Sequence, residues 1–262
     1  MSQDPVRFEL DGPVARITLA RPDAANAIDL SLARALHAAA LRCDEERAVR
    51  AVLVTGEGRM FCAGGDLPSF ARAGDGRPAL IKEITTYLHA AIARFARMRA
   101  PVVAAVNGTA AGAGLALVAA ADLAVASDAA RFTLAYTRAG LVPDGSSTWF
   151  LPRLLGARRA LELMLTNRVL SAQEALAWGL VNRVVAAERV LPEADALARE
   201  LAGGATDAFG ATKRLLLLSP AQGLETQMEL ESRAIADASR SADAAEGIAA
   251  FLEKRAPRFE GR

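Results

Sequence analysis

The stretch PVVAAVNGTAAGAGLALVAAAD, residues 101–122, decides the fold because it joins a strand to a helix through a glycine-rich turn. The apolar run 102–106 predicts a buried strand, which breaks at Asn107. From about Gly112 the sequence, rich in glycine and alanine, predicts a helix. Backbone N–H groups at a helix start lack partners and lie at the positive end of the helix dipole. We therefore expect this corner to bind an anion or an oxyanion.

Three other interpretations fit the same stretch to different degrees. Tight packing of a strand on a helix, with no ligand, stays open because a glycine-rich turn is weak evidence for a site. A phosphate-binding loop is disfavoured, since neither its lysine nor the G-x-G-x-x-G spacing is present. The run between Arg99 and Asp122 carries no charge and is long enough to cross a membrane. Its many alanines and glycines, with Asn107 among them, argue against that.

The composition limits the partners of the chain. A length of 262 residues is enough for one sizeable core, with or without an appended region. The net charge of +1 gives no electrostatic case for nucleic acid or an anionic membrane as a partner. Cys43 and Cys62 fit no metal site and no disulfide framework, and the N-terminus has no signal-peptide core, so we expect a cytoplasmic protein.

The two histidines, His37 and His89, lie in predicted helices, away in sequence from the glycine-rich corners. We expect both to be structural or surface residues, which leaves no histidine triad and no metal site. Cys62 has no histidine near it in sequence, and we interpret it as a small packed residue.

Strand–helix units fill the first two thirds of the chain, and helices fill the last third. Asp29 is expected to cap a helix that runs to about residue 46, and Ser171 to cap one over 172–178. The small, charged segment 71–78 predicts a loop, a candidate mobile cover over a site. Apolar runs and alternating patterns predict strands at 6–10, 14–19, 51–55, 102–106, 122–126, 131–133 and 181–185.

Two further segments resemble functional turns. RMFCAGGDL, residues 59–67, follows a predicted strand, and its two glycines allow the backbone to approach a ligand closely. Asp66 can cap a short helix after it. In AGLVPDGSSTW, residues 139–149, Pro143 and Gly145 force a turn with Asp144 at its apex.

Six motifs in chain order resemble the crotonase superfamily, also called the enoyl-CoA hydratase/isomerase family. The resemblance covers essentially the whole chain. It implies an α/β fold in which a spiral of ββα units over 1–200 is followed by a helical region over 201–262. The resemblance also implies that this region mediates trimer formation, often as a dimer of trimers. The motifs are the loop 21–28, FCAGGDL at 61–67, AAVNGTAAGAGL at 104–115, FTLAYTRAGLVPDGSSTWFLPRLLG at 132–156, LELMLTNRVLSAQEALAWGLVNRVV at 161–185 and AFLEKRAPRFEGR at 250–262.

The resemblance also implies an acyl-CoA thioester as substrate, with coenzyme A as part of that substrate and no other cofactor. Carried over by motif, the backbone N–H groups of Gly65 and Ala113 form an oxyanion hole for the thioester oxygen. Lys254 is expected to meet a coenzyme A phosphate, in this subunit or a neighbouring one. The remaining substrate-binding residues implied by the motifs are Ala25, Ala63, Gly64, Asp66, Leu67, Gly112, Tyr136 and Trp149.

Departures from the family pattern indicate the reaction. The two glutamates of the family's hydratases fall at Ala116 and Tyr136, so the pair that delivers water to a double bond is missing. Asp144 falls where a subset of the family has a catalytic aspartate, in a run most similar to the ring-1,2-epoxyphenylacetyl-CoA isomerase group. We therefore expect an enoyl-CoA isomerase in which Asp144 moves a proton along the acyl chain.

Alternatives remain for Asp144 and for the whole chain. Asp144 can instead cap the helix that starts near Ser146, or act as a nucleophile, as in 4-chlorobenzoyl-CoA dehalogenases and thioesterase-like members. The chain can also be a hydratase or lyase with another acid and base, or a binding module without turnover. We expect Tyr136 to be pocket wall. We expect Asp144 to be buried among four apolar residues, Leu141, Val142, Trp149 and Phe150.

Overall fold

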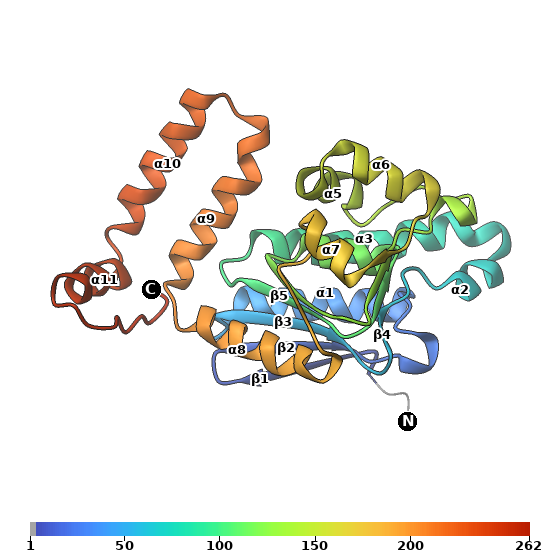
Figure 1. The fold of residues 1–262 in the computed structure, drawn as a ribbon, viewed down its shortest axis with the longest axis horizontal. Helices are drawn as coiled ribbons and strands as arrows, with labels where there is room; N and C mark the ends of the chain where they lie inside the picture. The colour runs from blue at the N-terminus through green and yellow to red at the C-terminus, as the bar shows by residue number, and fades with distance from the viewer. Residues whose placement is uncertain (1–3) are drawn as a thin grey trace.

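The computed structural model describes residues 4–262 and contains a six-stranded sheet in the order β1-β2-β3-β5-β7-β10 (Figure 1). The first pair of strands is antiparallel and every later pair is parallel. The strands span β1 (Val6–Asp11), β2 (Val14–Leu19), β3 (Ala51–Gly56), β5 (Val102–Val106), β7 (Leu123–Ser127) and β10 (Arg183–Val185).

A smaller sheet has the order β4-β6-β8-β9. Its first three strands run parallel and the last is antiparallel. The strands are short: β4 (Met60–Cys62), β6 (Thr109–Ala111), β8 (Arg131–Thr133) and β9 (Leu170–Ser171). Together the two sheets give a mixed α/β fold, as the sequence predicts, and most of their strands run parallel.

The large sheet is covered on both faces, and its central strands β3 and β5 are buried at every position and mostly apolar. On one face, Val52 and Val54 belong to the same core as the helices α1 (Leu30–Glu45) and α3 (Arg77–Arg97), which pack against each other. The alternate residue Leu53 points to the other face, where it packs in a core that includes residues of α8 (Val190–Ala202). Figure 1 shows these helices along the sheet.

Most of the predicted element boundaries are confirmed, and the prediction for one segment is wrong. Asp29 caps α1 by accepting a hydrogen bond from the Leu32 N–H at 2.8 Å. The predicted loop 71–78 is instead helical: it holds the end of α2 (Leu67–Arg72), a 3-10 turn at Gly74–Gly76 and the start of α3. The remaining helices of the main body are α4 (Ala113–Ala120), α5 (Ser147–Leu155), α6 (Ala157–Thr166) and α7 (Ala172–Trp178).

The last three helices form a separate arm that projects away from the sheets (Figure 1). They are α9 (Thr206–Leu218), α10 (Leu224–Ala238) and α11 (Ala242–Leu252). We propose that the boundary between the two regions lies at residues 203–205, because α8 still packs on the large sheet. Lys213 anchors the arm to the body: its Nζ lies 2.6 Å from an Asp122 carboxylate oxygen and donates to the carbonyls of Phe95 and Ala100.

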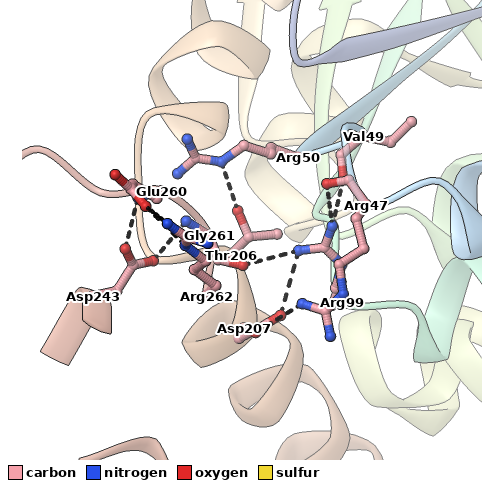
Figure 2. Close-up of polar contacts among 10 residues, drawn as sticks. All are labelled: Arg47, Val49, Arg50, Arg99, Thr206, Asp207, Asp243, Glu260, Gly261 and Arg262. Carbon is pink, nitrogen blue, oxygen red and sulfur yellow. Dashed lines mark hydrogen bonds and ion pairs between the residues drawn. The ribbon is translucent and has the colours of Figure 1, made fainter. Parts of the chain in front are cut away.

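The C-terminal tail returns to the base of the arm (Figure 2). Both carboxylate oxygens of Asp243 accept backbone hydrogen bonds, from Glu260 at 2.6 Å and from Gly261 at 2.8 Å. Arg50 donates to the carbonyl of Phe259 and to that of Gly204. The tail therefore ties α11 to the start of α9. No helix within residues 4–262 is both long and apolar enough to span a membrane.

Candidate active site

The candidate site lies where three parallel strands of the small sheet end. Residues 63–65 come directly after β4, Gly112 and Ala113 directly after β6, and residues 134–146 follow β8. Carboxyl ends of parallel strands meet at one edge of a sheet, which is where α/β proteins place their ligands. The topology thus brings together the segments that the sequence analysis singled out.

The two glycine-rich corners touch each other. A Cβ atom on Gly64 would lie 2.9 Å from the carbonyl oxygen of Ala111 and 3.3 Å from the backbone nitrogen of Ala113. Gly64 also has a φ of +89°, a conformation that side chains rarely tolerate. Position 64 therefore has to be glycine for the loop after β4 to reach the start of α4.

The N–H groups of Gly65 and Ala113 are free. Among residues 4–262 neither has a hydrogen-bond acceptor, whereas the neighbouring Asp66 N–H donates to the carbonyl of Ile28 at 3.1 Å. Ala113 is the first residue of α4, so its N–H also lies at the positive end of the helix dipole. Both groups can therefore donate to a bound oxygen atom.

A cavity of about 180 Å³ lies against these two residues and against Asp144 and Tyr136. The rest of its lining is mostly aliphatic, which suits an acyl chain. Of the lining residues that the structure describes, Asp144 carries the one carboxylate. The other lining residues are Ile28, Phe70, Ile81, Ile84, Thr85, Leu88, Leu141 and Val142.

The two carboxylate oxygens of Asp144 have different neighbours. Oδ1 accepts a hydrogen bond of 2.5 Å from the Tyr136 hydroxyl. Loss of water around that hydroxyl, and the negative charge of Asp144, raise the pKa of Tyr136, so it stays a neutral donor. Oδ2 lies 3.3 Å from Nε2 of His89, and the Gly145 N–H donates to the same nitrogen at 3.2 Å.

Asp144 does not cap a helix, so that alternative is wrong. At the start of α5 the Ser147 N–H and hydroxyl donate to the Asp144 main-chain carbonyl, at 3.1 and 2.7 Å, and the Asp144 carboxylate takes no part in the cap. The expected burial is also wrong in part, because Val142 is 80% exposed in this chain. Leu141, Trp149 and Phe150 are half-buried.

His89 was not expected at the site, because its partner Asp144 is 55 residues away along the chain. A signal was present. Ile81, Ile84, Thr85 and Leu88 line the cavity, and with His89 they form a stripe at spacings i, i+3, i+4, i+7 and i+8 on α3. His89 therefore lies at the edge of this stripe, where it lines a neighbouring groove and reaches Asp144.

Other predicted site residues lie nearby without lining the cavity. Ala25 and Ala63 are joined by a backbone hydrogen bond of 3.0 Å. Gly112 packs against Gly64. Asp66 is buried, caps α2 through the Ser69 N–H at 2.9 Å, and pairs with Arg21 at 3.1 Å.

Three more predicted residues are further from the cavity. Leu67 is exposed at the start of α2. Trp149 lines a neighbouring groove of about 470 Å³, together with His89 and Gly145. Lys254 is exposed just after α11, which lies at the opposite end of the molecule from α2 (Figure 1). Within one subunit Lys254 is therefore separate from the site.

Among the described residues that line the cavity, no second carboxylate replaces the missing glutamates. Ala116 is fully buried, and a Cβ atom on Gly145 would lie only 3.0 Å from its Cβ atom, so the bend after Asp144 covers this position. Cys62 is also fully buried, which raises the pKa of its thiol to about 12 and leaves it protonated. No cluster of metal-binding side chains occurs among residues 4–262.

Comparison with known proteins identifies the family. The family model "Enoyl-CoA hydratase/isomerase" matches residues 9–262. A probable enoyl-CoA hydratase of Rhodobacter capsulatus is 40% identical over all of both chains. The 1,2-epoxyphenylacetyl-CoA isomerase of Escherichia coli K12 is 37% identical over 95% of each chain. A 4-chlorobenzoyl coenzyme A dehalogenase-2 of an Arthrobacter species is 36% identical, over 92% of this chain and 88% of that protein.

A solved structure extends the likeness to the fold. The crystal structure of an enoyl-CoA hydratase from Polaromonas sp. JS666 superposes with a TM-score of 0.93 at 34% identity. The match covers 97% of this chain and 99% of that one.

Proposed function

Because the chain belongs to the enoyl-CoA hydratase/isomerase family, we propose that it is an isomerase that moves a double bond along an acyl-CoA thioester. One observation carries this proposal. Among residues 4–262, the cavity contains a single carboxylate, that of Asp144, and His89 Nε2 is the one possible hydrogen-bond donor near its Oδ2. Beside it lie two backbone N–H groups, those of Gly65 and Ala113, that have no acceptor among residues 4–262. A double-bond shift needs one group that removes a proton and returns it elsewhere, whereas hydration needs a pair.

The proposed chemistry follows from these groups. The thioester oxygen accepts hydrogen bonds from the N–H groups of Gly65 and Ala113. Asp144 Oδ2 takes a proton from one carbon of the acyl chain, and the resulting dienolate is stabilised at its oxygen. Each such donor contributes on the order of 3 kcal/mol to lowering the barrier. The proton then returns from Oδ2 to another carbon, so Asp144 ends each cycle as a carboxylate. Coenzyme A takes part only as a portion of the substrate.

A panel of acyl-CoA thioesters tests the proposal. Purified protein is incubated with 2-enoyl, 3-enoyl and aromatic acyl-CoAs, and products are followed by absorbance and mass. We expect a 3-enoyl-CoA to gain the absorbance of a conjugated thioester with no change in mass. Rapid hydration of crotonyl-CoA, seen as a mass gain of one water, would instead establish a hydratase.

A second candidate is supported by His89. If Asp144 attacked the chlorine-bearing ring carbon of an aromatic acyl-CoA, chloride would leave and an aryl ester of Asp144 would form. The nearby imidazole nitrogen of His89 would then be placed to activate the water that hydrolyses this ester. The similarity to a 4-chlorobenzoyl coenzyme A dehalogenase suggests which substrate to test for this chemistry. Rapid quenching with 4-chlorobenzoyl-CoA, followed by peptide mass analysis, would detect an adduct on Asp144. The mainly aliphatic cavity lining favours the isomerase.

We also propose that the protein forms a trimer or a dimer of trimers through its C-terminal arm. The arm exposes large apolar side chains that include Leu224 at 70%, Ile235 at 73% and Phe251 at 83%. Burial of such surface drives association. In such an assembly Lys254 would meet the substrate of a neighbouring subunit. Light scattering on the purified protein tests this, and a stable monomer would contradict it.

A further inference from the structure

The two contacts of His89 Nε2 require opposite protonation states. The Gly145 N–H points at this nitrogen from 3.2 Å, which needs a lone pair on it. Asp144 Oδ2 lies 3.3 Å from the same nitrogen, and a carboxylate attracts it only when the nitrogen carries a proton. Only one of the two contacts can be a hydrogen bond at a time.

The groups around His89 decide between these states. Asp144 is the negative charge that faces it. Arg97 of α3 and Arg153 of α5 line the same groove and oppose a charge on the ring, and the guanidinium of Arg153 lies 3.9 Å from the Trp149 ring centroid. The end of α9 and the turn after it contribute only apolar residues, Leu217, Leu218, Pro220 and Ala221. His89 is also half in solvent, so it can exchange protons with water.

We propose that His89 is a positioning residue that decides whether Asp144 Oδ2 is free. In its neutral form His89 accepts the Gly145 N–H, which holds the bend in place and leaves Oδ2 without a donor. When it takes a proton from water, Nε2 releases the Gly145 N–H and donates to Oδ2. The oxygen that would remove the substrate proton is then occupied.

This inference rests on the proposed role of Asp144 as the base. It predicts that the enzyme loses activity when His89 gains a proton as the pH falls. Without His89, this loss of activity should no longer occur at the same pH. A residue with only a structural role would not move this limb of the pH profile.

The test compares three proteins: wild type, His89→Gln and His37→Gln. The glutamine side-chain oxygen can accept the Gly145 N–H but does not titrate, and His37 is the only other histidine of the chain. We expect kcat/KM of wild type and of His37→Gln to fall about tenfold per pH unit on the acidic limb of the pH profile. In His89→Gln this limb should move down by at least about one pH unit. An unchanged limb in His89→Gln overturns the proposal.

A second measurement needs no turnover and no stable variant at position 89. NMR of the wild-type protein with isotope-labelled histidine, assigned by the signal missing in His37→Gln, reports which ring nitrogen holds the proton. At about pH 8 we expect the proton of His89 on Nδ1 and none on Nε2. A proton on Nε2 at that pH overturns the proposal. If no acyl-CoA were isomerised while Nε2 stayed bare, the proposed function would fail and the state of His89 would not.

Discussion

Two carboxylates, one at the cavity and one at the base of the arm, are used in opposite ways. Asp243 is 4% exposed and both of its oxygens accept backbone N–H groups of the returning tail (Figure 2). One oxygen of Asp144 accepts a hydrogen bond from Tyr136, and its other oxygen faces a nitrogen of His89 that already accepts a hydrogen bond. A saturated carboxylate holds the backbone in place, whereas one with a free oxygen beside a cavity can exchange protons.

The largest effect is expected from Asp144→Asn. An amide cannot take up the substrate proton, so kcat for isomerisation should fall by about 10³-fold, within the range of general-base effects. The thermal midpoint should stay close to that of the wild type, since this carboxylate holds no backbone group. Asp75→Asn, at an exposed carboxylate in the turn before α3, is the matched control. Full activity in Asp144→Asn would assign the base elsewhere.

Asp243→Asn, in contrast, is expected to lower the stability of the fold. One backbone N–H of the tail would then face an amide NH2 group, and leaving a buried donor unpaired costs about 1–3 kcal/mol. The free energy of unfolding, measured by denaturant titration, should fall by that amount. Asp237→Asn removes an exposed carboxylate of the same arm and should change little. Equal stability of the two variants would mean that saturation of Asp243 is unimportant.

A smaller loss is expected from Tyr136→Phe. The change removes the hydrogen bond to Oδ1 and keeps the ring, so the carboxylate loses its orientation while the cavity keeps its shape. Hydrogen bonds to charged groups are worth about 1.5–3 kcal/mol, which corresponds to a loss of about tenfold to a hundredfold in kcat. Tyr87→Phe, at the only other tyrosine, is the control. Unchanged turnover in Tyr136→Phe would reduce Tyr136 to pocket wall.

The smallest effect is expected at Cys62. Burial raises the pKa of its thiol to about 12, so almost no thiolate exists at about pH 8. Iodoacetamide should therefore leave Cys62 unmodified in the folded protein, and Cys62→Ala should leave kcat nearly unchanged. Peptide mass analysis after alkylation checks the first point. Rapid labelling with loss of activity would make Cys62 a functional thiol.

Much of the fold could be predicted because its signals are local. Ser171 caps α7 in a full capping box with Glu174, and the strand β5 is visible as an apolar run. The two-residue strand β9 was not predicted, since it exists only by pairing with β8. The segment 71–78 looked like a loop because it is small and charged. Pro78 instead lies in the first turn of α3, where proline is favourable.

The site was less predictable than the fold, because it depends on which side chains meet. The two glycine-rich corners could be located, since free N–H groups follow from strand–turn–helix geometry. The side chain of Asp66 pairs with Arg21, and that of Trp149 lines a separate groove. Both orientations depend on contacts between residues far apart in the sequence. The stripe on α3 includes His89, but His89 reaches Asp144 only because α3 lies against the bend after β8, and that contact joins residues far apart in the sequence.

The fate of a labelled hydrogen tests the single-carboxylate mechanism most directly. A 3-enoyl-CoA that carries deuterium on the carbon next to the thioester carbonyl is converted in ordinary water, and the product is analysed by mass and NMR. If one carboxylate removes and returns the proton, part of the deuterium should appear on the far carbon of the original double bond, with no water added. A product that has gained water, or the same transfer of label by Asp144→Asn, would contradict the mechanism.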